Sequence, residues 1–169
     1  LALRNSYPNY IISKNKIVKI EEGFVTKAKE ADIEINLKNK YLLPGLIDLH
    51  VHIEGDYDSH SYISKYVDNE ADVAFESVRI AEITLLAGFT TVRDLGGTGV
   101  NISLRNAINK GTVKGPRIFA AGKSIATTGG HADPTNGSSR KLMGDPGPLE
   151  GVINSPEDAV KAVRQRYKE

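Results

Sequence analysis

The sequence predicts an α/β fold, and three observations carry that prediction. A short apolar run ends in the histidine pair His50 and His52, as expected for a buried strand. Between positions 89 and 121, short β-branched segments alternate with a helical pattern, which indicates parallel strands joined by crossover helices. The first 40 residues carry only short alternating segments. We therefore expect a β-rich entry segment followed by consecutive β/α units.

The entry segment contains three predicted strands. Two cover residues 9–13 and 17–20, with a polar turn between them. A third is expected over 33–37, where isoleucine or leucine alternates with polar residues. The pattern predicts a small β-module, and an independent hairpin is the alternative.

Residues 41–52 predict the first strand of the main sheet. Side chains alternate along a strand, so Asp48, His50 and His52 share one face. Two imidazoles at that spacing can hold one metal ion, and they lie at the carboxyl end of the strand, where α/β barrels keep their chemistry. Asp48 has two interpretations, orienting an imidazole or bonding to a backbone amide, and we favour the second.

The next β/α units are predicted from periodicity. A polar loop with His60 precedes a helix whose apolar stripe lies at positions 74, 78, 81 and 85 and which ends at Gly88. A strand over 89–93, a helix over 102–110 and a strand over 117–121 follow. Where the second strand ends, Arg93 and Asp94 are expected either to direct one side chain into the cavity or to form an ion pair or cap.

The chain changes character between residues 122 and 154, which are rich in glycine, serine, threonine, aspartate and proline. A loop this long usually carries function. Because it follows the carboxyl end of a strand, it should lie at the same end of the sheet as the histidine pair, at the mouth of the predicted barrel. A final helix is expected with Ser155 as N-cap and Asp158 completing a capping box. We expect Val160, Val163 and Tyr167 to form its inward face.

Three segments together carry a family resemblance: Pro-Gly-Leu-Ile-Asp-Leu-His-Val-His at 44–52, Ala-Gly-Phe-Thr-Thr-Val-Arg-Asp at 87–94, and the loop from 121 to His131 and Asp133. They resemble the opening of the metal-dependent amidohydrolase superfamily. The third segment is most similar to its imidazolonepropionase-like branch, which includes the Xaa-Pro dipeptidases.

The resemblance implies a fold and a domain division. Residues 1–43 would be part of a small composite β-sandwich, and residues 44–169 would be the first three β/α units of a (β/α)8 TIM barrel. Such a barrel needs about 250 residues, so we expect the 169-residue chain to be the N-terminal portion of the enzyme.

The resemblance also implies the site. His50 and His52 would be metal ligands for zinc, with two divalent ions in the intact enzyme, and the remaining ligands and a catalytic aspartate would lie beyond Glu169. His131 would contact the substrate and stabilise the oxyanion, and His60 would face the same mouth. An exposed loop histidine is the alternative for both.

Composition limits the partners. The chain has 22 basic and 21 acidic residues, so its net charge of +1 gives no case for nucleic acid or an anionic membrane. No apolar run reaches the length of a membrane span. With no cysteine, a metal must be held by histidine, carboxylate or modified lysine. The compartment stays open, with cytoplasm favoured over periplasm, and a homo-oligomer is expected.

The predicted function is hydrolysis of a peptide or amide C–N bond through a metal-bridged hydroxide, in an Xaa-Pro-like dipeptide or an N-acyl amino acid. The alternatives are a cyclic amide hydrolase or deaminase of the same superfamily, a non-catalytic barrel scaffold, and a self-contained unit with a structural metal. We expect residues 1–169 alone to be inactive, because the rest of the barrel would complete the site.

Overall fold

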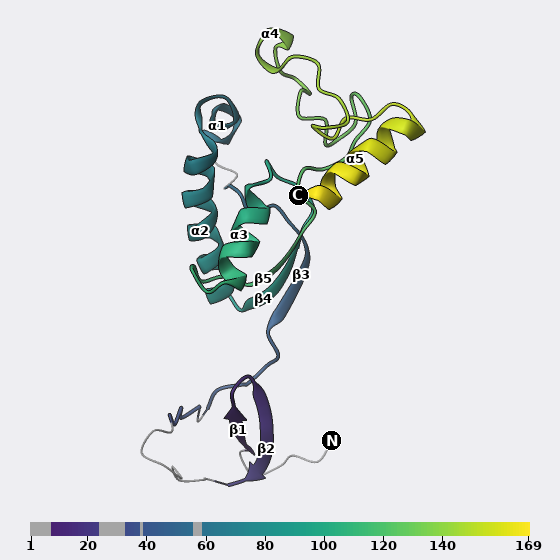
Figure 1. Ribbon diagram of the computed structural model, residues 1–169. Helices are drawn as coiled ribbons and strands as arrows, with labels where there is room; N and C mark the ends of the chain where they lie inside the picture. Colours follow the sequence, from purple (N-terminus) through teal and green to yellow (C-terminus); the bar gives the residue numbers. More distant parts are fainter. Residues whose placement is uncertain (1–7, 24–32, 38, 56–58) are drawn as a thin grey trace. The chain divides into compact units, whose positions relative to one another are not determined.

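The computed structural model describes residues 8–23, 33–37, 39–55 and 59–169. The chain divides into two compact units, residues 1–44 and 45–169. Figure 1 shows both units.

The first unit contains an antiparallel hairpin. Strand β1 (Pro8–Ser13) pairs with β2 (Lys16–Glu22), and the register shifts between Ile11 and Ile12. The turn places Lys14 at a φ of 56°, in the left-handed region. Both predicted strands are therefore confirmed, and each is longer than expected.

The third strand predicted for the first unit is wrong. Residues 33–37 form no helix or strand, although their apolar residues alternate as predicted. Ile33 is 88% exposed and Ile35 is 74% exposed. Alternation makes a segment suitable for a sheet, but a strand also needs a neighbour for its backbone hydrogen bonds. The described residues of this unit supply none for 33–37.

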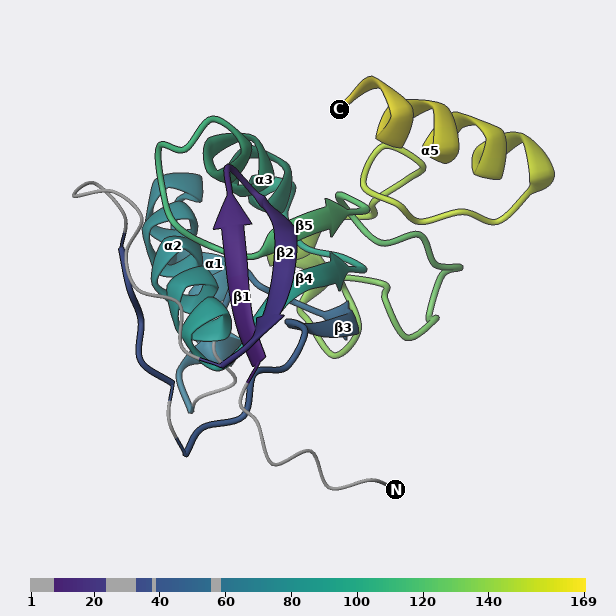
Figure 2. The ribbon, with the colours of Figure 1, turned by 90° about the horizontal axis from the view of Figure 1, so that it is seen from below.

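The second unit is built on a three-stranded parallel sheet of β3 (Leu46–Val51), β4 (Phe89–Asp94) and β5 (Arg117–Ala120). The strands lie in the order β3-β4-β5 and run in the same direction, as the arrows in Figure 2 show. Helices α2 (Glu70–Leu86) and α3 (Val100–Asn109) both cover one face. The predicted α/β fold is thus confirmed, with β/α units in the expected order.

The core lies between this sheet and its two helices. It comprises Ile53, Ala81, Val92, Leu104 and Ile118, each no more than 4% exposed. They come from the loop after β3, from both helices and from the two other strands, so their burial joins every element of the unit's centre.

Local signals explain where the helices begin and end. Helix α2 starts in a capping box in which Asn69 and Asp72 satisfy each other's backbone N–H groups. It stops before Gly88, whose φ of 100° suits glycine. Helix α3 begins two residues earlier than predicted and stops before Gly111, which has a φ of 73°.

Helix α5 (Pro156–Lys168) has Ser155 as its N-cap residue, as predicted. The Ser155 hydroxyl accepts a hydrogen bond from the Asp158 N–H at 3.1 Å. The Asp158 carboxylate accepts from the N–H of Asn154 at 3.2 Å, so this helix has no reciprocal box with Ser155.

The inward face predicted for α5 is wrong. Ala162 is the residue of this helix that is fully buried. The three side chains expected to face inward are exposed, by 50% to 94%: Val160, Val163 and Tyr167. The apolar stripe was read correctly from the sequence, but no described element lies against it.

Two short helices lie in the connections. Helix α1 (Ser61–Val67) precedes α2, and α4 (Arg140–Met143) interrupts the long loop after β5. Both lie on the side of the sheet toward which the carboxyl ends of the strands point (Figure 1). Among the described residues, no helix has the length and apolar content to cross a membrane.

Candidate metal and substrate site

The histidine pair lies at the carboxyl end of β3. His50 is the next-to-last residue of the strand, which ends at Val51, and His52 follows Val51. Both side chains are exposed, and their ring centroids are 5.4 Å apart at an interplanar angle of 71°. Two imidazoles this close can contribute to one metal centre.

A hydrogen bond orients the ring of His52. Its Nδ1 lies 2.7 Å from the carbonyl oxygen of Gly96, in the loop after β4. A carbonyl only accepts, so Nδ1 carries the proton and donates, which leaves the Nε2 lone pair for a metal ion. A backbone carbonyl on one ring nitrogen is the usual support of a metal-ligating histidine.

This donor set fits a divalent cation such as zinc, which accepts imidazole nitrogen. Within the part of the chain that the structure describes, no cluster of three or more histidines and carboxylates could hold a metal. A metal site that used His50 and His52 would therefore need further ligands.

Asp94 holds the loops that place the pair. Its carboxylate is fully buried and accepts three hydrogen bonds, from Ile53 N at 3.0 Å, Gly96 N at 3.0 Å and Asn101 Nδ2 at 3.1 Å. The loop after β3, the loop after β4 and the start of α3 thus meet at one carboxylate. Asp94 therefore has a structural role as an acceptor between loops, and it is not the cap of α3, whose N-cap residue is Gly99.

Arg93 points away from Asp94, as alternation along β4 requires. Its Nε donates to the carbonyl of Leu49 on the neighbouring strand at 2.8 Å. The proposed ion pair between Arg93 and Asp94 is therefore wrong. Asp48 accepts a hydrogen bond from the N–H of His50 at 2.9 Å, which confirms the favoured interpretation of that carboxylate.

Glu54 is a supporting residue that sequence reasoning missed. Its carboxylate accepts from the N–H groups of Thr98 and Asn101, at the start of α3. A side chain at Gly97 would lie 2.4 Å from that carboxylate, so glycine permits the approach. The signal was present as a glutamate directly after the histidine strand and a glycine-rich loop before a helix.

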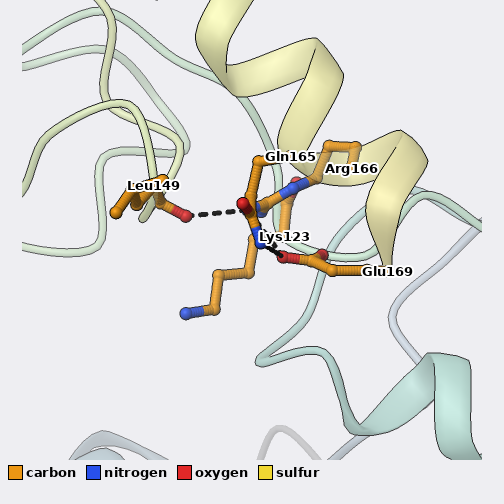
Figure 3. Close-up of polar contacts among 5 residues, drawn as sticks. All are labelled: Lys123, Leu149, Gln165, Arg166 and Glu169. Atoms are coloured by element: carbon orange, nitrogen blue, oxygen red, sulfur yellow. Dashed lines mark hydrogen bonds and ion pairs between the residues drawn. The ribbon is translucent and has the colours of Figure 1, made fainter.

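The long loop that carries His131 is fastened at its base. Ala126 pairs with Val152 in an isolated parallel bridge, and the Ser124 hydroxyl donates to the Leu95 carbonyl at 2.9 Å. Helix α5 adds a clamp, in which Arg166 donates to the carbonyls of Lys123 and Leu149 at 3.4 and 2.7 Å (Figure 3). The two ends of the loop are therefore held together by one side chain.

His131 lies exposed in a turn of this loop, beyond the bridge. His60 lies at the N-cap position of α1, where its carbonyl accepts from Ile63 N at 2.8 Å and Ser64 N at 3.1 Å. Its ring Nδ1 is 3.3 Å from the Ser59 hydroxyl.

Helix α1 and the long loop touch each other. Lys65 Nζ donates to the Ser138 hydroxyl at 2.7 Å, and the Tyr62 hydroxyl donates to the Gly137 carbonyl at 3.3 Å. The segments carrying His60 and His131 are thus joined at the carboxyl ends of the strands. A hollow of about 570 Å³ beside β5 is lined by none of the four histidines, so it is separate from these segments.

The sequence profile of the amidohydrolase family matches residues 41–169, most of the chain. The chain belongs to the amidohydrolase family. The match covers both histidines of the pair, all three parallel strands and the loop with His131, so the family resemblance noted in the sequence is confirmed.

Two solved amidohydrolase relatives are similar in fold and sequence. The crystal structure of an Xaa-Pro dipeptidase with methionine bound in its active site is 46% identical, with a TM-score of 0.84 over 94% of this chain and 39% of that chain. A prolidase complexed with N-methylphosphonate-L-proline is 28% identical, with a TM-score of 0.72 over 96% of this chain and 39% of that one.

A third relative, a curated protein, matches over a smaller share of both chains. Ochratoxinase from Aspergillus niger is 37% identical over 93 residues, which are 54% of this chain and 19% of that protein. The chain thus spans about two fifths of the two solved relatives and a smaller part of the curated one.

Proposed function

We propose that the intact protein is a metal-dependent dipeptidase that hydrolyses Xaa-Pro dipeptides. The observation that carries this proposal is the hydrogen bond from His52 Nδ1 to the Gly96 carbonyl, which leaves the Nε2 lone pair for a metal ion in a ring whose centroid is 5.4 Å from that of His50. The likeness to the Xaa-Pro dipeptidase and to the prolidase supports the substrate class.

In this proposal each histidine has its own task. His50 and His52 hold zinc or another divalent ion, which supplies a Lewis acid for amide hydrolysis when bound. His131 donates a hydrogen bond to the scissile carbonyl or to the substrate carboxylate, where it stabilises developing negative charge. His60 lines the same mouth. The further ligands of two metal ions, and the proton-transferring aspartate, come from the remainder of the barrel.

A second candidate substrate is an N-acyl amino acid or another small amide, which the match to ochratoxinase favours. A cyclic amide hydrolase, a deaminase and a non-catalytic scaffold are the other outcomes of the test. All of them keep the barrel, and they differ in whether and where a nucleophile attacks.

The test uses the full-length protein, purified with its metal quantified. A panel of Met-Pro, Ala-Pro, N-acetyl-methionine and a cyclic amide separates the candidate activities, and we expect the Xaa-Pro dipeptides to be cleaved fastest. We expect His50→Ala or His52→Ala to remove metal and lower turnover at least about 100-fold. His131→Ala is the matched control, with lower turnover and metal retained. A His52→Ala protein that keeps full metal content and turnover would contradict the assignment of His52 as a metal ligand.

A further inference from the structure

His131 lies in a turn that is closed by a side chain two residues further on. The carboxylate of Asp133 accepts from the N–H of Gly129 at 2.8 Å through Oδ2. Its other oxygen, Oδ1, accepts from the N–H of Thr135 at 2.9 Å and from the Thr135 hydroxyl at 2.7 Å. One carboxylate therefore links the backbone on both sides of His131.

Burial separates the roles of the two residues. Asp133 is 7% exposed, whereas His131 is exposed. The Thr135 hydroxyl, followed by the N–H groups of Gly129 and Thr135, holds the pKa of Asp133 below its ordinary value. The carboxylate is thus a charged acceptor inside the turn, and the imidazole is presented on its outside.

The backbone of the turn leaves little room for another arrangement. Gly129 has a φ of 71°, and a side chain at Gly130 would lie 2.9 Å from the Thr127 carbonyl. Asn136 Nδ2 donates to the Gly130 carbonyl at 2.6 Å. Asn154 bonds Thr128 from outside, with Nδ2 donating to the Thr128 hydroxyl at 2.8 Å. The Asp133 carboxylate therefore holds the turn from inside. Asn154, which precedes the N-cap residue of α5, holds it from outside.

We infer that Asp133 is a positioning residue for His131, holding the imidazole where it meets the substrate. This inference rests on the function proposed above and names a residue to which that function gives no task. A displaced catalytic contact of about 1 Å can lower a rate by 100-fold, so a fixed turn of this kind has a measurable effect.

The experiment uses the full-length enzyme with Met-Pro as substrate and Asp133→Asn as the main variant. Asparagine keeps the shape, but its NH2 group faces the Gly129 N–H, donor against donor. We expect kcat/KM to fall about 10- to 100-fold with metal content retained. Asp145→Asn is the matched control, since Asp145 lies exposed in the same loop with its carboxylate on Arg140, and it should match the wild type.

The decisive comparison is a double-mutant cycle with His131→Ala. If Asp133 acts through His131, adding Asp133→Asn to His131→Ala lowers kcat/KM by less than about threefold. Thr135→Val, which removes one donor and keeps the charge, should give a smaller loss than Asp133→Asn and show the same dependence on His131. It replaces Asp133→Asn if that variant does not fold.

Three outcomes overturn the inference. Equal losses from Asp133→Asn, or from Thr135→Val in its place, in the wild-type and His131→Ala backgrounds would make the turn merely structural. A clear loss in His131→Ala with none in Asp133→Asn would overturn the role of Asp133 alone. Full turnover in His131→Ala would remove the role proposed for His131 and this inference with it.

Discussion

At the scale of single residues, the placement of the histidine pair was predictable and the contacts that support it were not. Alternation along a strand places His50 and His52 together from the sequence alone. The carbonyl that orients His52 belongs to Gly96, 44 positions away, and becomes its neighbour only because β4 pairs with β3. Contacts of this kind depend on tertiary packing, so no local sequence pattern predicts them.

Asp94 gives the first prediction at this scale. Asp94→Ala leaves buried donors of Ile53, Gly96 and Asn101 without their acceptor, and each such group costs about 1–3 kcal/mol. We expect a loss of at least about 2 kcal/mol in the free energy of unfolding, measured by urea denaturation. The exposed Asp145→Ala variant should stay within about 0.5 kcal/mol of wild type. Equal stabilities for the two variants would contradict the role of Asp94.

Asp133 adds a dependence on pH. Its hydrogen bonds from Thr135 and Gly129 depress the pKa of the folded-state carboxyl. A carboxyl of this kind stabilises the folded state above its unfolded pKa of about 3.9, and the contribution is lost as the pH falls through the lower folded value. We expect the stability difference between wild type and Asp133→Asn to be constant from about pH 5 to pH 7 and to shrink below about pH 4. Urea unfolding at each pH measures it, and a constant difference down to about pH 3 would contradict it.

At the scale of elements, prediction succeeded where both the signal and its partner lie close in the sequence. Helices α2 and α3 follow from an apolar stripe and a terminal glycine, and β4 and β5 from β-branched or apolar runs between them. The strand expected over 33–37 and the inward face expected for α5 failed for one shared reason. Each pattern describes a surface suited to a neighbour, and the described residues contain no such neighbour.

Helix α5 provides the element-scale prediction. Arg166 clamps Lys123 and Leu149, so Arg166→Gln should let the two ends of the His131 loop separate (Figure 3). We expect faster amide hydrogen exchange over residues 124–152, with unchanged exchange in α2. Arg164→Gln is the matched control, because Arg164 is exposed on the same helix. Unchanged loop exchange in Arg166→Gln would show that the bridge at Ala126 suffices.

At the scale of the whole molecule, the face of the sheet away from α2 and α3 is open. Phe119 of β5 is 59% exposed there, and the described residues contain no group of three or more histidines and carboxylates that could hold a metal. We expect residues 1–169, produced alone, to bind zinc weakly and to have no turnover on Met-Pro, because a catalytic zinc needs about three protein ligands. Metal titration and the dipeptide assay, run beside the full-length protein, check this. Turnover by the short chain at the full-length rate would contradict it.

The loop after β4 also bears on which positions of this fold can vary among relatives. The N–H of Gly96 donates to the Asp94 carboxylate, and its carbonyl accepts from the His52 ring. A side chain at this position would lie 1.7 Å from the Ser124 hydroxyl. The position is closed to replacement from three sides. Most of the stretch from 139 to 149, around α4, is exposed and lies beyond the bridge that closes the His131 loop. We therefore expect the exposed side chains of this stretch to vary more among relatives than Gly96 does.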